Sequence, residues 1–257
     1  MKETTIGFIG GGRVTRIILC GWKRAGRSLA NVVVSDANAA TVSALKAVHP
    51  EISTGDSRTV AGQSVVFFAV HPPVMAALLA ELRGAIQPDA LVVSFAPKFT
   101  MAKIAEGLGG HRLMARVIPN APSIMGLGYN PVAFAADMNV EVKHNLLGLL
   151  AALGESPEVA ESKLEGFALL TAMGPTYLWF QLQTLRELAT SFGLDAADVT
   201  PALKRMVCGA TRTLLESGLS PSDVIDLVPV KPLADDEATI KAAYQNRLPA
   251  LFAKIKP

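Results

Sequence analysis

The chain has 257 residues, of which half are hydrophobic and 18% are charged, and its formal net charge is +2. A composition this apolar supports a folded core and excludes a disordered chain. The small charge, carried by scattered basic residues, excludes a surface specialised for nucleic acid. The two cysteines, Cys20 and Cys208, are far apart, so we expect neither a disulfide framework nor a bound metal.

No apolar stretch reaches the roughly 18 residues of a membrane span. The first residues, Met1 to Thr5, lead directly into a strand-like run and do not read as a secretory signal. We therefore expect a cytoplasmic protein that does not contact a membrane.

Short apolar runs alternate with helical patterns along the first 160 residues. The predicted strands are Thr5–Gly10, Asn31–Ser35, Ser64–Val70, Ala90–Ser94, Leu113–Ile118 and Pro131–Ala135. The predicted helices between them are Val14–Ala25, Ala39–Val48 and Pro72–Gly84. Strands that alternate with helices and are apolar throughout indicate a parallel sheet covered on both faces. The predicted fold class is α/β, with an N-terminal, doubly wound Rossmann-type sheet that is mostly parallel.

From Glu161 onward the strand patterns stop and long helical patterns replace them. The predicted helices are Ser162–Ala172, Pro175–Phe192, Asp195–Ser217 and Asp235–Lys254. Within the second, an apolar stripe at helical spacing predicts a buried face at Phe180, Leu182, Leu185 and Leu188. We predict a dinucleotide-binding domain over residues 1–160 and an all-α substrate and dimerisation domain over 161–257.

The first predicted strand ends in a glycine turn, Gly10-Gly11-Gly12-Arg13-Val14-Thr15. Gly10 and Gly12 fit a Gly-x-Gly-x-x-Gly/Ala fingerprint, and Thr15 takes the third small position. The first glycine permits a tight turn, and the second lets the backbone approach a pyrophosphate. The helix that follows offers free N–H groups and the positive end of its dipole. The motif therefore predicts a bound nicotinamide dinucleotide.

Asp36 follows the second predicted strand, and the stretch from Ser35 to Asn38 contains no Arg or Lys. An acidic residue here accepts a hydrogen bond from the ribose 2′-OH and repels a 2′-phosphate, which favours NADH over NADPH. The alternative is that Asp36 caps the helix that begins at Ala39.

Four further segments follow the glycine turn in order, and together they carry a resemblance. They are Phe68-Ala69-Val70-His71-Pro72, Val92-Val93-Ser94-Phe95-Ala96, Arg116-Val117-Ile118-Pro119-Asn120-Ala121-Pro122 and Gly174-Pro175-Thr176-Tyr177. From about Ile6 to about Asp226 the chain resembles the pyrroline-5-carboxylate reductase family. This resemblance implies the NAD(P)H-dependent reduction of a C=N bond in a small cyclic imino acid, as in proline biosynthesis. It also implies a homodimer formed through the helical domain.

The resemblance also implies roles for individual residues. Carried over by position, the residues that contact the cofactor are Gly10, Gly12, Arg13, Val14, Asp56, Ala69, Val70, His71, Pro72, Ala96 and Asn120. Asn120 and Tyr177 are placed at the substrate. Apart from the resemblance, Thr171 and Tyr177 flank the Gly174-Pro175 corner, so either hydroxyl is a candidate hydrogen-bond partner of the substrate. The alternative for Tyr177 is that it begins a buried helix face.

The chain departs from the family where the family has Ser-Pro-Gly-Gly-Thr-Thr, a loop whose amides hold the substrate carboxylate. Here the positions hold Pro229-Val230-Lys231-Pro232-Leu233-Ala234-Asp235, and proline has no N–H to donate. Lys231 is therefore a candidate carboxylate partner. Lys98, which follows a strand end where the family has glycine, is a candidate carboxylate partner or proton donor. The alternative for both lysines is a solvated surface charge.

Two other functions stay open from the sequence. One is a β-hydroxyacid-type dehydrogenase on the same cofactor domain, for which Lys163 is the nearest candidate catalytic lysine. The other is a dinucleotide-binding sensor without catalysis, which the altered loop at 229–235 favours.

Overall fold

The computed structural model describes residues 4–257. The chain divides into two compact units, one formed by the chain up to Met173 together with Leu251–Pro257, and the other by Gly174–Ala250. The sequence places its domain boundary at Glu161, whereas residues 161–173 and 251–257 pack with the first unit. The functions predicted for the two segments stay predictions.

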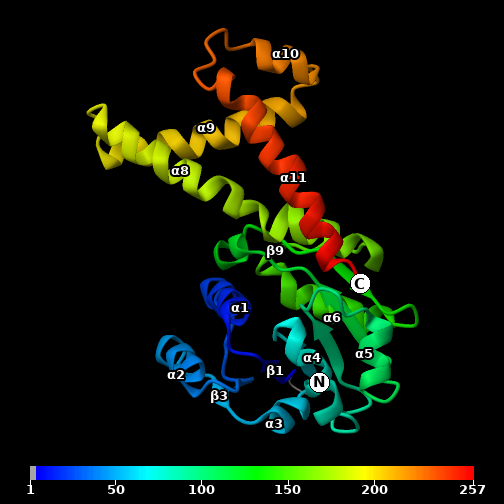
Figure 1. Ribbon diagram of the computed structural model, residues 1–257. Coiled ribbons are helices and arrows are strands. Elements are labelled where there is room, and N and C mark those ends of the chain that lie inside the picture. The colour runs from blue at the N-terminus through cyan, green and yellow to red at the C-terminus, as the bar shows by residue number, and fades with distance from the viewer. Residues whose placement is uncertain (1–3) are drawn as a thin grey trace. The chain divides into compact units, whose positions relative to one another are not determined.

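The first unit is built on a seven-stranded sheet with the order β3-β2-β1-β4-β5-β6-β8 (Figure 1). Its strands are β1 (Ile6–Ile9), β2 (Val32–Ser35), β3 (Ser53–Thr54), β4 (Val65–Phe68), β5 (Leu91–Ser94), β6 (Met114–Val117) and β8 (Val132–Phe134). All neighbours pair in parallel except β6 and β8, which pair antiparallel. The order reverses between β1 and β4, as in a doubly wound Rossmann sheet. The predicted α/β fold class is confirmed.

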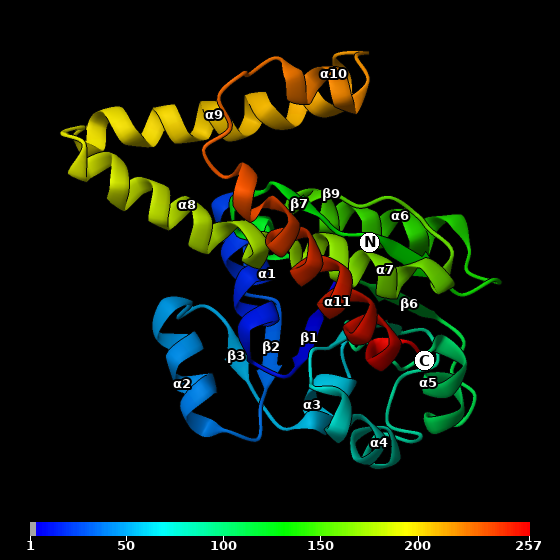
Figure 2. The same ribbon diagram turned by 45° about the horizontal axis from the view of Figure 1, so that its top comes forward.

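Helices cover both faces of this sheet (Figure 2). Buried side chains of α1 (Arg13–Arg24), α2 (Ala39–Val48) and α6 (Val140–Ala151) form one apolar cluster with the sheet. Buried side chains of α3 (Ser57–Ala61), α4 (Pro72–Glu81) and α5 (Met101–Gly107) form the other. Alternate residues of one strand therefore enter different clusters, as the two-residue period of a strand requires. Both faces are buried, which explains why the strands read as continuous apolar runs.

Trp22 anchors α1, the helix that follows the glycine turn. It is fully buried, its ring packs edge-on against Phe8 and Phe67, and its indole N–H donates to the carbonyl of Leu149 at 2.7 Å. A buried Trp is well placed when its N–H finds such a partner. The contact holds the helix, and with it the turn at its N-terminus, against the sheet.

The sheet-bearing unit also contains short elements. These are η1 (Ala121–Met125), β7 (Gly128–Tyr129), β9 (Gly154–Glu155), η2 (Glu161–Lys163), α7 (Leu164–Phe167) and a π-helical turn, η3 (Ala168–Ala172). The helix predicted over Ser162–Ala172 is thus a 3₁₀ turn, one α-turn and one π-turn in succession. Strand β7 pairs with β9 in a separate two-stranded sheet.

The second unit is helical. It contains α8 (Gly174–Ser191), α9 (Ala196–Glu216), α10 (Pro221–Asp226), η4 (Ala234–Asp236) and most of α11 (Glu237–Ile255). Helices α8 and α9 form a hairpin, yellow in Figure 1, that turns at Gly193 with φ +90°. The buried stripe predicted on α8 is wrong for the isolated chain, because no residue of this helix is buried. In the described part of the chain, residues 4–257, no helix is long and apolar enough to cross a membrane.

Candidate functional site

A crevice of about 980 Å³ opens at the carboxyl ends of the parallel strands, in the sheet-bearing unit. Ile9 and Gly10 line it from β1, Ser35 and Asp36 from β2, and Ala69 from β4. Such a crevice beside the point where strand order reverses is where open α/β sheets bind ligands. Of the predicted cofactor contacts, the following line the crevice: Gly10, Gly12, Arg13, Val14, Asp36, Ala69, Val70, His71 and Pro72.

The two predicted glycines meet different local demands. Gly10 has φ +104°, and a Cβ on it would lie 2.4 Å from the carbonyl oxygen of Ala69. Gly12 is the N-cap of α1, and a Cβ on it would meet nothing within 4 Å. The first glycine is therefore required by the fold, whereas the second leaves open space above the helix N-terminus.

The N-terminus of α1, next to this open space, has the features that a dinucleotide site needs. The first turn of α1 contains no acidic residue, and Arg13 projects an exposed side chain beside it. The helix itself thus contributes no negative charge to its positive end. A pyrophosphate fits this combination of free donors, positive potential and bare backbone.

Asp36 is tied to the glycine turn by its carboxylate. One oxygen accepts from the N–H of Gly11 and the other from the N–H of Asn38, both at 2.8 Å. The helix α2 is capped instead by Asn38, whose side chain accepts from the N–H of Ala40. Asp36 is therefore not the helix cap, and its charge is held at the end of the crevice that the glycine turn forms.

The opposite end of the crevice is apolar, and most of its wall was not predicted from the sequence. It is lined by Phe95, Pro97, Ile118, Pro119, Ala168, Ala172 and Met173. The first four follow β5 and β6. Residues just beyond the carboxyl ends of parallel strands line the ligand crevice, so the sequence could have predicted them. The last three belong to the π-helical turn and the residue after it. Nothing in their local pattern indicates that they face the crevice.

Five predicted residues lie next to the crevice without lining it. Asp56 caps α3 by accepting from the N–H and the hydroxyl of Thr59, and the side-chain hydrogen bond lowers the pKa of Asp56. Ala96 is buried between Phe95 and Pro97. The other members of this group are Asn120, Thr171 and Lys98.

Asn120 and Thr171 are joined to each other. The side-chain amide of Asn120 donates to the carbonyl of Thr171 at 3.2 Å, while its oxygen accepts from the N–H of Tyr129. The hydroxyl of Thr171 donates to the carbonyl of Phe167 at 2.9 Å. Asn120 therefore holds the π-helical turn against the segment after β6, at the edge of the crevice.

Lys98 has φ +70°, and it is the one non-glycine residue with positive φ among residues 4–257. Its side chain is exposed. A side chain in this left-handed region costs about 1 kcal/mol or more. The backbone here thus has the conformation that glycine adopts most readily.

We expect Lys98→Gly to raise the free energy of unfolding by about 0.5–1 kcal/mol, because glycine removes the strain of positive φ. Urea denaturation measures the change. The control is Gly84→Ala at φ +74°, where a Cβ would meet nothing within 4 Å, and the stability change there should have the opposite sign. A Lys98→Gly protein less stable than the parent contradicts the strain.

Tyr177 and Lys231 belong to the helical unit. The ring of Tyr177 on α8 packs edge-on against Tyr244 of α11, with centroids 5.7 Å apart. Desolvation, and then Tyr244, raises the pKa of Tyr177, so its hydroxyl stays protonated at neutral pH. Lys231 is exposed in the segment between α10 and η4. Among residues 4–257, no group of three or more His, Cys, Asp or Glu side chains is arranged to hold a metal ion.

Comparison with known proteins points to one group of enzymes. Residues 5–98 match the family model described as NADP oxidoreductase coenzyme F420-dependent. Pyrroline-5-carboxylate reductase of Escherichia coli K12 is 28% identical over 231 residues, which are 88% of this chain and 85% of the relative. The enzyme of that name from Methanosarcina acetivorans is 25% identical over 256 residues, which are 96% of this chain and 94% of the relative.

Solved structures agree with these relatives. A pyrroline-5-carboxylate reductase from Coxiella burnetii superimposes with a TM-score of 0.69 at 26% identity, covering 98% of this chain and 94% of its own. The Plasmodium falciparum pyrroline carboxylate reductase with NADP bound superimposes with a TM-score of 0.74 at 16% identity, covering 99% and 95%. The second likeness, at so low an identity, concerns the fold alone.

Proposed function

We propose that this chain, which is similar to pyrroline-5-carboxylate reductases along most of its length, reduces the C=N bond of a small cyclic imino acid with a nicotinamide dinucleotide as reductant. The observation that carries the proposal is the bare turn at Gly12, which leaves space and main-chain donors at the N-terminus of α1. The apolar far end of the crevice supports it, since a reduced nicotinamide ring needs a site from which water is excluded.

Each part of the chain has a task in this reaction. Gly10, Gly12, Arg13 and Val14 line the crevice and would hold the pyrophosphate, while Ala69 to Pro72 would line the ribose and nicotinamide side. When bound, the cofactor supplies the hydride that the imine carbon accepts. The chain must then orient the imine and keep water away, which is a positioning task.

The imine itself needs little further activation. A protonated imine is already electrophilic, so no strong general base is required. We propose Thr171 and Lys98 as the groups that meet the imine nitrogen or the carboxylate, for which the Thr171 hydroxyl must turn away from the carbonyl of Phe167. Asn120, Tyr177 and Lys231 are proposed as substrate contacts. These roles, like those of Asp56 and Ala96 toward the cofactor, stay predictions.

The test is a steady-state assay that follows the oxidation of NADH or NADPH with 1-pyrroline-5-carboxylate. Matched 2-oxo acids and 3-hydroxy acids, the latter with the oxidised cofactor, serve as controls for the dehydrogenase alternative. Turnover of the imine alone supports the proposal. Saturable cofactor binding without turnover of any compound overturns it in favour of a sensor.

We further propose that NADH is preferred to NADPH, since the Asp36 carboxylate stands at the adenosine end of the crevice. Asp36→Asn keeps an acceptor for the N–H of Gly11 but removes the charge that repels a 2′-phosphate. We expect the affinity ratio of NADPH to NADH to rise about tenfold, or about 1.4 kcal/mol. Fluorescence titrations at one fixed ionic strength measure it, because salt screens the repulsion. A parent protein that prefers NADPH contradicts the assignment.

The helical unit supports a proposal of homodimerisation. Helix α8 exposes large apolar side chains at Leu178, Trp179, Phe180, Leu185 and Leu188, and Phe192 follows it. An apolar surface of this kind on a helix hairpin is typical of a subunit interface. Sedimentation equilibrium distinguishes a dimer from a monomer.

The dehydrogenase alternative lacks an observation in its favour. Lys163, its candidate catalytic lysine, is exposed at the end of η2 and does not line the crevice.

A further inference from the structure

Arg116 is a charged residue in an apolar layer of the sheet. It lies on β6 between Met114 and Ile118, and both neighbours belong to the apolar cluster on the α4 and α5 face. Because alternate residues of a strand point to one face, Arg116 points into the same layer. Its side chain is 1% exposed. A buried guanidinium is costly unless its charge is paired.

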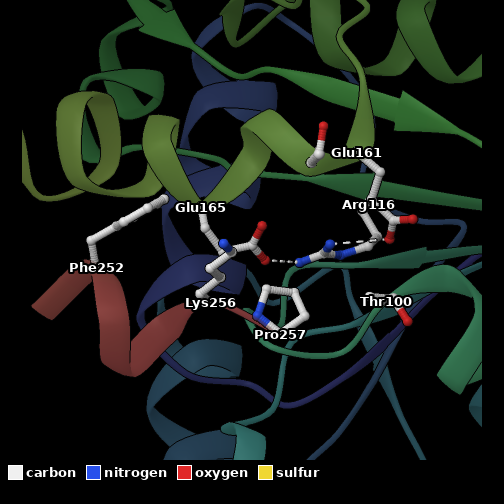
Figure 3. Close-up of a pocket in the computed structure, with 8 residues that line it drawn as sticks. Thr100, Arg116, Glu161, Glu165, Phe252, Lys256 and Pro257 are labelled. Carbon is white, nitrogen blue, oxygen red and sulfur yellow. Dashed lines mark hydrogen bonds and ion pairs between the residues drawn. The ribbon is translucent and has the colours of Figure 1, made fainter.

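The guanidinium joins three segments that are remote in sequence. One terminal nitrogen donates to Glu165 at 2.6 Å and to the carbonyl of Ala96 at 3.3 Å. The other donates to Glu161 at 3.1 Å. The same oxygen of Glu161 also accepts from the N–H of Met101, the first residue of α5. Figure 3 shows Arg116 reaching toward both carboxylates at a pocket of about 280 Å³.

Stability alone does not account for this arrangement. A buried ion pair costs so much desolvation that apolar side chains of similar volume are often as stabilising in its place. Glu165 is as deeply buried as Arg116, with 3% of its side chain exposed. The pair differs from an apolar contact in geometry, because a planar guanidinium fixes the direction of each partner.

Two of the three partners of Arg116, Ala96 and Glu165, belong to segments that form the far end of the crevice. Ala96 lies between Phe95 and Pro97, which line one wall. Glu165 is on α7, which continues directly into the π-helical turn, and Ala168 and Ala172 of that turn line the other wall. The side chain of Arg116 thus connects the two segments that form the walls.

We propose that Arg116 is a positioning residue that sets the spacing of the two walls around the nicotinamide end of the crevice. The inference rests on the proposed function, since it takes the far end of the crevice to hold the nicotinamide ring. Arg116 does not touch the reacting atoms. It acts through the carbonyl of Ala96 and the carboxylate of Glu165.

The main test replaces both members of the pair with apolar residues, as Arg116→Met with Glu165→Leu. Arg116→Met alone leaves the buried carboxylate of Glu165 without its cation and is prone to unfold, whereas the double variant should melt close to the parent. We expect its affinity for ADP-ribose, which lacks the nicotinamide ring, to be unchanged. Its dissociation constant for NADH should rise about tenfold, and kcat should fall on the order of a hundredfold, more than KM changes.

Arg116→Lys separates positioning from support of the fold. Lysine keeps a cation for Glu165 but lacks the fork that also reaches the carbonyl of Ala96. We expect Arg116→Lys to be more thermally stable than Arg116→Met, while its kcat stays below that of the parent. The matched control is Glu158→Gln, which breaks the exposed pair of Lys143 and Glu158, 2.7 Å apart, away from the crevice. Glu158→Gln should change neither the thermal stability nor kcat.

Parental NADH affinity and kcat in the double variant overturn the inference, as does full recovery of kcat in Arg116→Lys. An equal loss of ADP-ribose and NADH affinity overturns it too, because the defect then lies outside the nicotinamide end. The binding measurements need no imine, so failure of the proposed reaction in the parent protein is distinguished from failure of the inference.

Discussion

Gly12→Ala should raise the dissociation constant for NADH about a hundredfold, with the free energy of unfolding within about 1 kcal/mol of the parent. A Cβ at this position meets no protein atom within 4 Å, so the protein tolerates it. The methyl group instead occupies the space through which a pyrophosphate reaches the N-terminus of α1. The loss corresponds to one or two charge-assisted hydrogen bonds, each about 1.5–3 kcal/mol.

Titration of NADH fluorescence and urea denaturation of the same preparation measure the two quantities. Gly148→Ala is the matched control, because a Cβ added to this glycine of α6 also meets nothing within 4 Å, and Gly148 lies outside the crevice lining. It should leave the affinity unchanged. Parental NADH affinity in Gly12→Ala means that the turn does not hold the diphosphate.

Gly10→Ala, only two residues away, should instead damage the fold. A Cβ there lies 2.4 Å from the carbonyl oxygen and 2.7 Å from the carbonyl carbon of Ala69, and φ is +104°. The neighbouring atoms are main chain, and the N–H of Ala69 donates to the carbonyl of Ile9 at 2.8 Å. Relief of the contact must therefore separate the ends of β1 and β4. We expect a loss of about 3 kcal/mol or more in the free energy of unfolding.

Urea denaturation monitored by circular dichroism measures this loss. Gly26→Ala is the reference, because Gly26 has φ +78° and no atom within 4 Å of an added Cβ. Its loss of about 1 kcal/mol reports the cost of the backbone conformation alone. If Gly10→Ala costs no more than Gly26→Ala, the close approach to Ala69 does not constrain the fold.

The parallel sheet was predictable because each of its long strands is an apolar run that alternates with a helix. The predicted helix over Ala39–Val48 matches α2, and Pro72 marks the start of α4 as expected. Helix α6 was not predicted, although Leu146, Leu149 and Leu150 are buried at helical spacing behind the N-cap Asn139. The two-residue strands β3, β7 and β9 carry no comparable pattern, since their partners define them.

The apolar stripe on α8 illustrates a different limit. Its periodicity correctly predicted a helix, but in the single chain Phe180, Leu185 and Leu188 are exposed and Leu182 is only half-buried. Helical periodicity identifies an apolar face. It does not tell whether residues of the same chain or of another copy bury that face.

Local demands on the backbone were determined by the sequence itself. Gly10 needs positive φ because of its place at the end of one strand, whereas the bare backbone at Gly12 is a requirement only of the proposed dinucleotide, and single residues beside one strand and one helix supply both. Asp36 could likewise be placed because it follows the neighbouring strand, although only the structure assigned the cap of α2 to Asn38.

The π-helical wall of the crevice and its contacts were decided by the tertiary structure alone. Arg116 and Glu165 are 49 positions apart, and Asn120 and Thr171 are 51 positions apart. No local pattern states that such residues meet, because the contact depends on how the chain after β8 and α6 returns to the sheet. A charged residue inside the apolar run at 113–118 was the available sign that a buried partner existed. Only the packing of α7 against β6 showed that Glu165 is the buried partner of Arg116 and that the pair lies next to the walls of the crevice.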